Sequence, residues 1–300
     1  MSKDKTSIFR NFAAEIAIEA GQILFSFFGK QIQTEYKDKN KTDPVSEADW
    51  ESQRYLTDRI KKKFPDHGIL GEETLKEEKG NDENPKDKMT DYLWVLDPLD
   101  GTKNFLNGIS IWGCSVGLLF KGEPIAGAIF LPEPTGKDDF LIYKASLGEG
   151  AFLGNERINV TMEEKPSRKK TISLPGSYWN QFKTIGGLKN NMGEIRTTGS
   201  ISFDLAMVAR GGLHYALFGV PSIWDVAAGI IIVKEAGGLA LQQKSIFKKW
   251  EPFKNFIKVN DPTKRINDLR NWKTPIIVGN SSICEYITSR IKKISRKKRS

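Results

Sequence analysis

Two aspartates flank a proline in the stretch Trp94-Val-Leu-Asp-Pro-Leu-Asp-Gly-Thr-Lys-Asn-Phe105, and these side chains are the first candidates for chemistry. The stretch begins as an apolar run that predicts a buried strand. Pro98 interrupts this strand because proline cannot donate to a sheet ladder. Asp97 and Asp100 are therefore expected where a strand ends and a helix begins. Carboxylate oxygens in such a place suit Mg²⁺, and the free amide N–H groups of a helix start suit phosphate.

Three further acids are expected at similar junctions, and together they favour a metal site over a simple capped turn. Glu72 lies in Ile69-Leu-Gly-Glu-Glu73, a pattern that predicts a strand end with one carboxylate pointing inward. Asp49 is early in a predicted helix, and Asp225 is the predicted N-cap of another. Carboxylates that converge repel one another unless cations neutralise them. Because no set of Cys or His residues offers a softer site, the residue types favour Mg²⁺.

The elements that must position these acids can be predicted from hydrophobic periodicity and turn residues. They alternate in a way that predicts an α/β fold. Predicted helices cover residues 7–28, about 49–64, 200–209, 226–236 and 282 onward, and predicted strands cover 92–96, 112–120, 124–130, 141–144, 150–153, 171–174, 213–218 and 274–278. Loops are predicted at 36–43 and 74–91. We predict an N-terminal half at residues 1–165, a C-terminal half at 166–288 and a basic tail at 289–300.

The composition is that of an ordinary globular protein, since 39% of the 300 residues are hydrophobic and 28% are charged. The two cysteines, Cys114 and Cys284, give no disulfide framework, which favours a reducing compartment, and we predict the cytoplasm. Neither a transmembrane segment nor a signal peptide is expected, because charged residues interrupt the apolar runs. The phosphate-loop, Gly-x-Ser-x-Gly and His-Glu-x-x-His motifs are absent from the sequence, which argues against the chemistries that they perform.

The net charge of +9 raises the alternative that the protein binds a polyanion. Seven Lys or Arg residues and no acid lie in the basic tail, so only +2 remains for the rest of the chain. Such a tail is usually a solvated end, but it can contact nucleic acid or an anionic membrane. Residues 241–273 form a predicted insertion that mixes basic residues with aromatic ones. This composition can bind single strands, but a surface insertion that packs its own aromatics is favoured. The aromatics are Phe247, Trp250, Phe253, Phe256 and Trp272.

Three blocks of the sequence resemble the inositol monophosphatase family, whose members are Mg²⁺-dependent, lithium-sensitive phosphatases. The blocks occur in the order and approximate spacing of the family, and the resemblance covers nearly the whole chain up to Leu239. They are Gly71-Glu72-Glu73, Asp97-Pro-Leu-Asp-Gly-Thr102 and Trp224-Asp225-Val-Ala-Ala-Gly229 with Glu235-Ala-Gly-Gly238. The resemblance implies an alternating αβαβα sandwich of the sugar-phosphatase type, often a homodimer, that hydrolyses a small-molecule phosphate ester.

The resemblance also implies a metal-binding role for each acid of these blocks. Glu72, Asp97 and the carbonyl of Leu99 would hold one Mg²⁺ ion. Asp97, Asp100 and Asp225 would hold a second, and Glu72 would reach a third, weaker ion through water. Two cations about 3.5–4 Å apart can activate a water molecule and stabilise the leaving oxygen of an in-line displacement. No covalent phosphoenzyme is then needed.

The water and the phosphate would be held by neighbouring groups. The resemblance implies that Glu72 and Thr102 orient the attacking water, and that Asp49 accepts a hydrogen bond from the Thr102 hydroxyl. The amide groups of Gly101 and Thr102 would hold the phosphate. The further substrate contacts that it implies are Asp100, Gly199 and Ser200.

The substrate is the point at which the sequence departs from the family pattern. Many inositol phosphatases carry a glutamate seven residues before the Trp-Asp acid, where it binds sugar hydroxyls, but here that position is Phe218. We expect Phe218 to contact a flatter or less polar leaving group, and Lys103 also resembles the bisphosphate-nucleotide and histidinol-phosphate branches. An inositol monophosphatase-like hydrolase is the leading prediction. The alternatives are a 3′(2′),5′-bisphosphate nucleotidase, a histidinol-phosphatase and, outside enzymes, a polyanion-binding protein that uses the basic tail.

Overall fold

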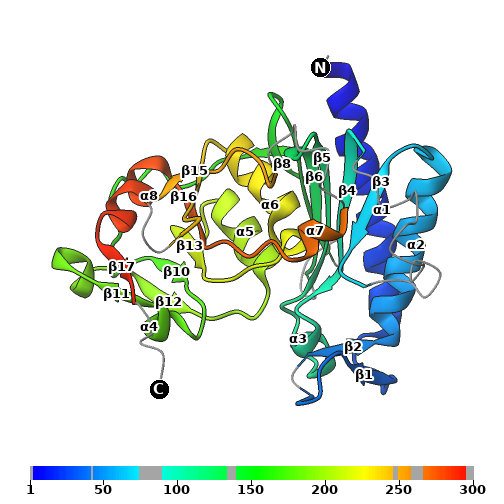
Figure 1. Cartoon of the computed structure of the whole chain (residues 1–300), viewed down its shortest axis with the longest axis horizontal. Helices are drawn as coiled ribbons and strands as arrows, with labels where there is room; N and C mark the ends of the chain where they lie inside the picture. Colours follow the sequence, from blue (N-terminus) through cyan, green and yellow to red (C-terminus); the bar gives the residue numbers. More distant parts are fainter. Residues whose placement is uncertain are drawn as a thin grey trace.

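Helices and sheets alternate in five layers in the computed structural model, which describes residues 3–41, 43–73, 90–133, 140–245, 249–257 and 266–294 (Figure 1). Two long helices form the outer layer on the right of the view, and two shorter helices lie between the two sheets. The predicted α/β class and αβαβα order are therefore confirmed. Among the described residues, no helix has the length and apolar character that a membrane span requires.

The first sheet has seven strands in the order β3-β4-β5-β6-β7-β8-β9, and only β3 and β4 pair in parallel. Helices α1 (Lys3–Phe27) and α2 (Glu47–Lys63) cover one of its faces and bury an apolar core against it. The strands are β3 (Gly68–Gly71), β4 (Tyr92–Asp100), β5 (Gly113–Phe120), β6 (Glu123–Pro132), β7 (Phe140–Ser146), β8 (Gly150–Leu153) and β9 (Glu156–Ile158). A hairpin of β1 (Thr34–Tyr36) and β2 (Pro44–Ser46) precedes α2, and the connection between its strands lies within the loop predicted at 36–43.

The second sheet has six strands in the order β12-β10-β13-β16-β14-β15. Helices α5 (Ile201–Ala209) and α6 (Ile223–Glu235) fill the space between the two sheets. Its strands are β10 (Thr171–Ser173), β12 (Glu194–Arg196), β13 (Tyr215–Phe218), β14 (Leu239–Gln242), β15 (Glu251–Pro252) and β16 (Ile276–Gly279). The main core cluster takes residues from both sheets, so the two halves share one interior. The division of the chain at residue 165 stays a prediction.

Small residues let α6 approach the first sheet closely. A Cβ atom added to Gly117 or Gly127 would come within 3 Å of the backbone of Ala228, at 2.9 and 2.8 Å respectively. The sequence Val-Ala-Ala-Gly, in the first turns of α6, is therefore needed for packing as well as for the position of Asp225. Asp225 was predicted to be the N-cap of this helix, but that prediction is wrong. Ser222 has the extended backbone of the N-cap position, and Asp225 lies in the first turn.

The fifth layer packs on the outer face of the second sheet. It contains α4 (Tyr178–Gln181), the 3-10 helix η3 (Gly186–Asn190), α8 (Ser281–Thr288) and a two-stranded ribbon of β11 (Phe182–Thr184) and β17 (Ile291–Lys293). Residues 291–293, near the beginning of the predicted basic tail at 289–300, form a strand. Ile291 is buried and anchors this strand in the core.

The insertion at 241–273 packs its own aromatic residues, as predicted. The rings of Phe253 and Phe256 are 4.8 Å apart, and Trp272 lies 4.9 Å from Phe256. These rings join the main core and support the short helix α7 (Ile266–Arg270). Phe247 and most of the predicted loop at 74–91 lie outside the described residues.

Asp204 is a buried acid of α5 whose titration is expected to reduce stability as the pH rises. It accepts hydrogen bonds from the hydroxyls of Ser173 (2.5 Å) and Thr198 (2.8 Å), yet burial raises its pKa to about 7. The unfolded chain loses this proton near pH 4, so between about pH 4 and pH 7 only the folded protein binds it. The free energy of unfolding should therefore fall over this window.

Asp204→Asn keeps an acceptor oxygen for one hydroxyl, places an amide N–H group beside the other and removes the charge. We expect its stability advantage over the wild type to grow between pH 4.5 and pH 8 by up to about 3 kcal/mol. Urea unfolding at several pH values measures this difference. Asp58→Asn, on the exposed face of α2, is the matched control and should show no such trend. A constant difference for Asp204→Asn across the range would contradict the assigned pKa.

Candidate active site

Glu72 and Asp97 leave the same edge of the first sheet from neighbouring parallel strands. Gly71 lies opposite Leu96, and the amide of Glu72 donates to the carbonyl of Leu96 at 2.9 Å. The next residues along the two strands are therefore side by side. Strand β4 continues past its proline, but its pairing with β5 shifts register between Asp97 and Asp100. This irregularity places both aspartates on the same end of β4, where they are buried.

Asp100 is held by the start of α5, which follows it by a hundred residues in the chain. Its Oδ2 accepts from the Ser200 hydroxyl (2.6 Å), the Ser202 amide (2.6 Å) and the Ser202 hydroxyl (2.5 Å). Burial raises the pKa of Asp100, and these donors partly offset the rise. Ser200, which was predicted to contact the substrate, directs its hydroxyl to Asp100 in this structure. Ser202 was not predicted, although it lies two residues further on.

Asp49 links α2 to the turn after β4. Its Oδ2 accepts from the amide (2.8 Å) and the hydroxyl (2.5 Å) of Ser46, and its Oδ1 accepts from the Thr102 hydroxyl at 3.1 Å. This contact between Asp49 and Thr102 was implied by the family resemblance and is present in the structure. The same hydroxyl is also 3.0 Å from the carbonyl of Leu99. Burial raises the pKa of Asp49 to about 6, and its bonds to Ser46 oppose the rise.

Asp225 lies in the first turn of α6, and its Oδ2 accepts from the amide of Ser222 at 2.7 Å. Lys273, from the end of the insertion, donates to the Ser222 hydroxyl and lies 5.6 Å above the ring of Trp224. Burial and the neighbouring carboxylate of Asp100 raise the pKa of Asp225 to about 8, although Lys273 opposes the rise. Sequence reasoning did not find Lys273, because nothing local links it to α6.

The four acids are close enough to affect one another's ionisation. Burial and the carboxylates of Glu72, Asp100 and Asp225 hold the pKa of Asp97 well above its ordinary value. Buried carboxylates that oppose each other's charge are stabilised by a cation, and oxygen donors of this kind match Mg²⁺. The carboxylate oxygens of these acids are therefore of the type that binds a hard cation.

The acids are nevertheless not preformed as a metal cage. Within the described parts of the chain, no group of three His, Cys, Asp or Glu side chains is arranged to hold a metal ion. Lys37 supplies one reason, since its ammonium lies 2.8 Å from Glu72 and 2.5 Å from Glu73. The serine donors on Asp100 supply another. These carboxylates must turn toward a common point before they can share a cation, so the metal assignment stays a prediction.

Lys37 was not predicted as a site residue. It lies in the loop of the β1–β2 hairpin, whose ends are joined by the bond from its amide to the carbonyl of Asp43 at 2.8 Å. Burial lowers the pKa of Lys37, but the carboxylates of Glu72 and Glu73 raise it by more. The net shift of the pKa is upward, so the ammonium group stays charged. In this structure Lys37 provides the positive charge that balances the two glutamates.

The predicted substrate residues are distributed unevenly around the site. Gly101 has φ of +87° and precedes α3 (Thr102–Leu106), and a Cβ there would lie 2.9 Å from the carbonyl of Ile111. Gly199, with φ of +83°, packs against Asn104. Phe218 is only 5% exposed and belongs to the main core at the end of β13. Its ring therefore offers little surface to a leaving group, contrary to the expectation of a stacking contact.

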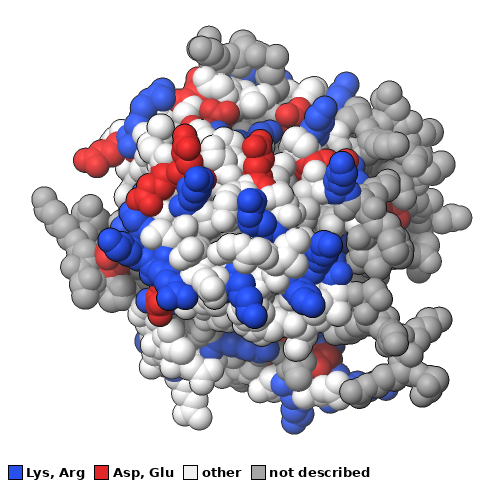
Figure 2. Space-filling model, turned by 90° about the vertical axis from the view of Figure 1, so that its left-hand side faces the viewer, with Lys and Arg blue, Asp and Glu red and all other residues white. Residues whose placement is uncertain are grey.

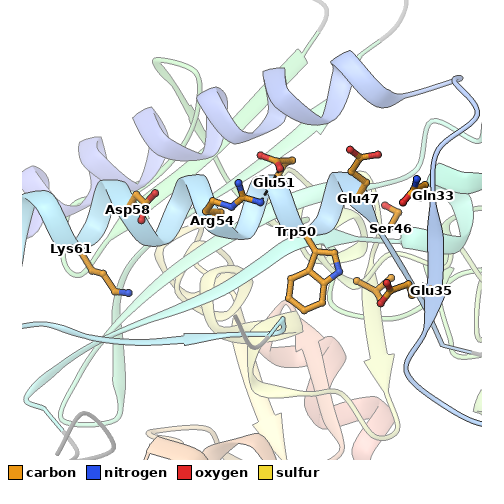
Figure 3. A pocket seen from close by; sticks show the side chains of 10 residues that line it. Gln33, Glu35, Ser46, Glu47, Trp50, Glu51, Arg54, Asp58 and Lys61 are labelled. Carbon is orange, nitrogen blue, oxygen red and sulfur yellow. Dashed lines mark hydrogen bonds and ion pairs between the residues drawn. The ribbon is translucent and has the colours of Figure 1, made fainter. Parts of the chain in front are cut away.

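A separate hollow of about 640 Å³ lies beside the solvent side of α2 (Figure 3). Acids and bases both line it, and Arg54 pairs with Glu51 at 2.9 Å. Its lining residues are Gln33, Glu35, Val45, Ser46, Glu47, Trp50, Glu51, Arg54, Asp58 and Lys61. None of them is a predicted metal ligand, so this hollow is distinct from the acidic site.

The protein has a five-layered α/β fold, and acids lie at the ends of β3 and β4 and at the start of α6. Together this fold and this site define a phosphatase of the αβαβα class. The inositol monophosphatase family model matches residues 5–251. The chain belongs to the inositol monophosphatase family, whose members are metal-dependent phosphatases of small phosphorylated metabolites.

Known proteins of this family are similar over most of their length. A fructose-1,6-bisphosphatase/inositol-1-monophosphatase of Aquifex aeolicus is 36% identical over 234 residues, which are 74% of this chain and 81% of that protein. A protein of the same description from Thermotoga maritima is 32% identical and covers 86% of this chain and 96% of its own. Among solved structures, the extragenic suppressor protein suhB of Bartonella henselae superposes with a TM-score of 0.69 at 28% identity, covering 93% of this chain and 96% of that chain.

Proposed function

We propose that this protein is a Mg²⁺-dependent hydrolase of sugar or polyol phosphate monoesters that uses two ions and a weaker third. The observation that supports this most is the convergence of four acids, from β3, β4 and α6, on one end of the first sheet. Burial and the neighbouring carboxylates raise the pKa values of Asp97 and Asp225, and a bound cation would relieve this repulsion. The family's lithium sensitivity is part of the same proposal.

Each residue has a specific task in this proposal. When bound, Mg²⁺ would polarise the phosphoryl oxygens and lower the pKa of a water molecule. One ion would be held by Glu72, Asp97 and the Leu99 carbonyl. The ligands proposed for the second are Asp97, Asp100 and Asp225. Glu72 must leave Lys37 before it can act as a ligand.

The attacking water would be oriented by Glu72 and by the Thr102 hydroxyl. Asp49 fixes that hydroxyl, and the two bonds from Ser46 fix Asp49 in turn. The positive φ of Gly101 turns the chain sharply before α3, and the amides of Gly101 and Thr102 would hold the phosphate. Transfer to water is then direct, without a covalent intermediate.

For the substrate class we favour sugar and polyol phosphates over nucleotides and histidinol phosphate. The two relatives described above are named for fructose 1,6-bisphosphate and inositol 1-phosphate. A stacking contact with Phe218 would favour nucleotides or histidinol phosphate, but this ring is buried.

A phosphate-release assay with a panel of substrates tests this proposal. With Mg²⁺, inositol 1-phosphate and fructose 1,6-bisphosphate should be hydrolysed faster than 3′-phosphoadenosine 5′-phosphate and histidinol phosphate. Chelation by EDTA should stop the release, and lithium should inhibit it. Preference for the nucleotide or for histidinol phosphate would overturn the substrate class. If the folded protein binds Mg²⁺ but releases phosphate from no substrate of the panel, the proposed reaction is overturned.

Two features of the biological setting belong to the same proposal. We propose a homodimer in the cytoplasm. The buried free thiols of Cys114 and Cys284 are compatible with a reducing compartment. Light scattering should give twice the mass of one chain, and cell fractionation should recover the protein with cytoplasmic markers.

A further inference from the structure

The positive charge of this protein is concentrated at one end of the molecule. Segments 165–196 and 281–294 contain ten Lys or Arg residues and two acids, a net charge of +8. Because the whole chain has a net charge of +9, all other residues together carry only +1. Figure 2 looks at this end, and Lys and Arg side chains gather across the centre of the face, with most acids near its upper edge. The uneven charge is therefore a property of one surface as well as of the tail.

The β11–β17 ribbon places like charges opposite each other within this surface. Lys183 pairs in register with Lys292, and both side chains are exposed. Like charges directly opposite one another destabilise a two-stranded ribbon. Among the described residues, the Lys and Arg ion pairs of this end are Lys170 with Glu163 and Arg196 with Glu194. The two ribbon lysines are thus available to a negatively charged ligand, which would also relieve their repulsion.

An exposed tryptophan borders a hollow in the same surface. Trp179 of α4 is 56% exposed, and it makes a T-shaped contact with the neighbouring Tyr178 ring at a centroid distance of 4.9 Å. The hollow has a volume of about 370 Å³, and Arg168, Lys189, Met192 and Ile195 line it together with Trp179. Glu194 also lines it but is paired with Arg196. A planar aromatic face between cations is the arrangement that stacks a nucleobase and neutralises its phosphates.

We propose that this end of the molecule, which we call the basic face (residues 165–196 and 281–294), binds single-stranded nucleic acid. One base stacks on Trp179, Arg168 and Lys189 contact the adjoining phosphates, and the backbone runs on toward Lys183 and Lys292. The acids of the candidate active site lie on other elements, so binding and hydrolysis are separable.

A single-stranded nucleic acid fits these observations better than the other polyanions. A lipid surface requires a flat array of charges and makes no use of a hollow beside an aromatic ring. A second copy of the chain would bring two positively charged faces together, which their repulsion opposes. Both occupants are outcomes of the experiment below.

The experiment measures fluorescence anisotropy of a labelled twelve-nucleotide single-stranded RNA at 50 to 300 mM salt. The full-length protein should bind, with affinity that falls steeply as salt rises. Trp179→Ala should weaken binding about tenfold or more, and Trp179→Phe should restore most of it, because both rings can stack. Lys183→Gln with Lys292→Gln should reduce the salt slope by about 2. The matched control is Lys61→Gln with Lys62→Gln, two exposed lysines of α2, which should bind like the wild type.

All these variants should retain the wild-type circular dichroism and phosphatase turnover, which separates a failure of this proposal from a failure of the proposed reaction. Absence of RNA binding at 50 mM salt would overturn the proposal. So would binding that Trp179→Ala and the ribbon variant leave unchanged while deletion of residues 295–300 abolishes it. Sedimentation with phosphatidylserine vesicles but not with RNA would assign the face to membranes. A dimer that Trp179→Ala dissociates would assign it to a second copy.

Discussion

Asp97→Asn is expected to reduce Mg²⁺-dependent phosphate release by about 10³-fold or more. In the proposed site this carboxylate is shared by two cations, so its loss removes several kcal/mol of transition-state stabilisation, and each 1.4 kcal/mol is about tenfold in rate. The same substitution should not harm the fold. Asp97 is 1% exposed and surrounded by the carboxylates of Glu72, Asp100 and Asp225, so an uncharged amide relieves repulsion.

The two effects of Asp97→Asn can be measured separately. Turnover is measured with saturating Mg²⁺, and the melting temperature is measured in EDTA, where each kcal/mol gained raises it by about 2–4 °C. The control is Asp91→Asn, an exposed acid just before β4 that pairs loosely with Lys121 at 3.7 Å. This control should keep both turnover and melting temperature. Wild-type turnover by Asp97→Asn would remove the metal assignment, whereas loss of turnover together with unfolding would indicate a structural role.

Glu72→Gln is expected to have the second largest effect, a loss of about 10²–10⁴-fold in turnover. This is the range for a group that positions and deprotonates an attacking nucleophile. Glu72 and Glu73 are adjacent, and both contact Lys37, so they form a natural pair for comparison. Glu72 directly follows Gly71, the residue that pairs with Leu96, whereas Glu73 is one position further on. Glu72 therefore lies beside Asp97, the residue that follows Leu96.

Glu73→Gln is therefore the matched control for Glu72→Gln. It removes one partner of Lys37, as Glu72→Gln does, but it leaves the proposed ligand in place, and we expect less than about a tenfold loss. Mg²⁺ binding measured by calorimetry gives a readout that does not depend on turnover. It should weaken in Glu72→Gln and remain in Glu73→Gln. Equal losses in the two variants would mean that the ion pairs with Lys37, rather than a ligand role of Glu72, explain the effect.

The position of Lys37 has a consequence for metal binding. The ammonium group of Lys37 balances the charge of Glu72 and Glu73. A cation that takes Glu72 as a ligand must compete with this pair. Because the ammonium lies in the loop of a short hairpin, it can withdraw without disturbing either sheet.

The sequence by itself determined the layers and the acids. Regular spacing of apolar residues over ten or more positions predicts long helices such as α1 and α2, and unbroken apolar runs predict the central strands. The acids were visible because Glu72, Asp97 and Asp100 each lie next to a Gly or Pro that marks a junction, while Asp49 and Asp225 each follow a Ser by three residues. The contact between Asp49 and Thr102, which followed from the family resemblance, is present in the structure.

Tertiary structure alone decided which side chains form hydrogen bonds or ion pairs with these acids and with the residues that hold them. Ser202 reaches Asp100, Lys37 reaches Glu72 and Lys273 reaches Ser222 across 102, 35 and 51 residues of sequence. Local periodicity contains no information about such long-range contacts. The three-residue strands β11 and β17 are too short for any pattern, and only their pairing turned part of a predicted tail into a basic face. Phe218 became a core residue for the same reason, since the packing of β13 against β16, and not its own type, set its exposure.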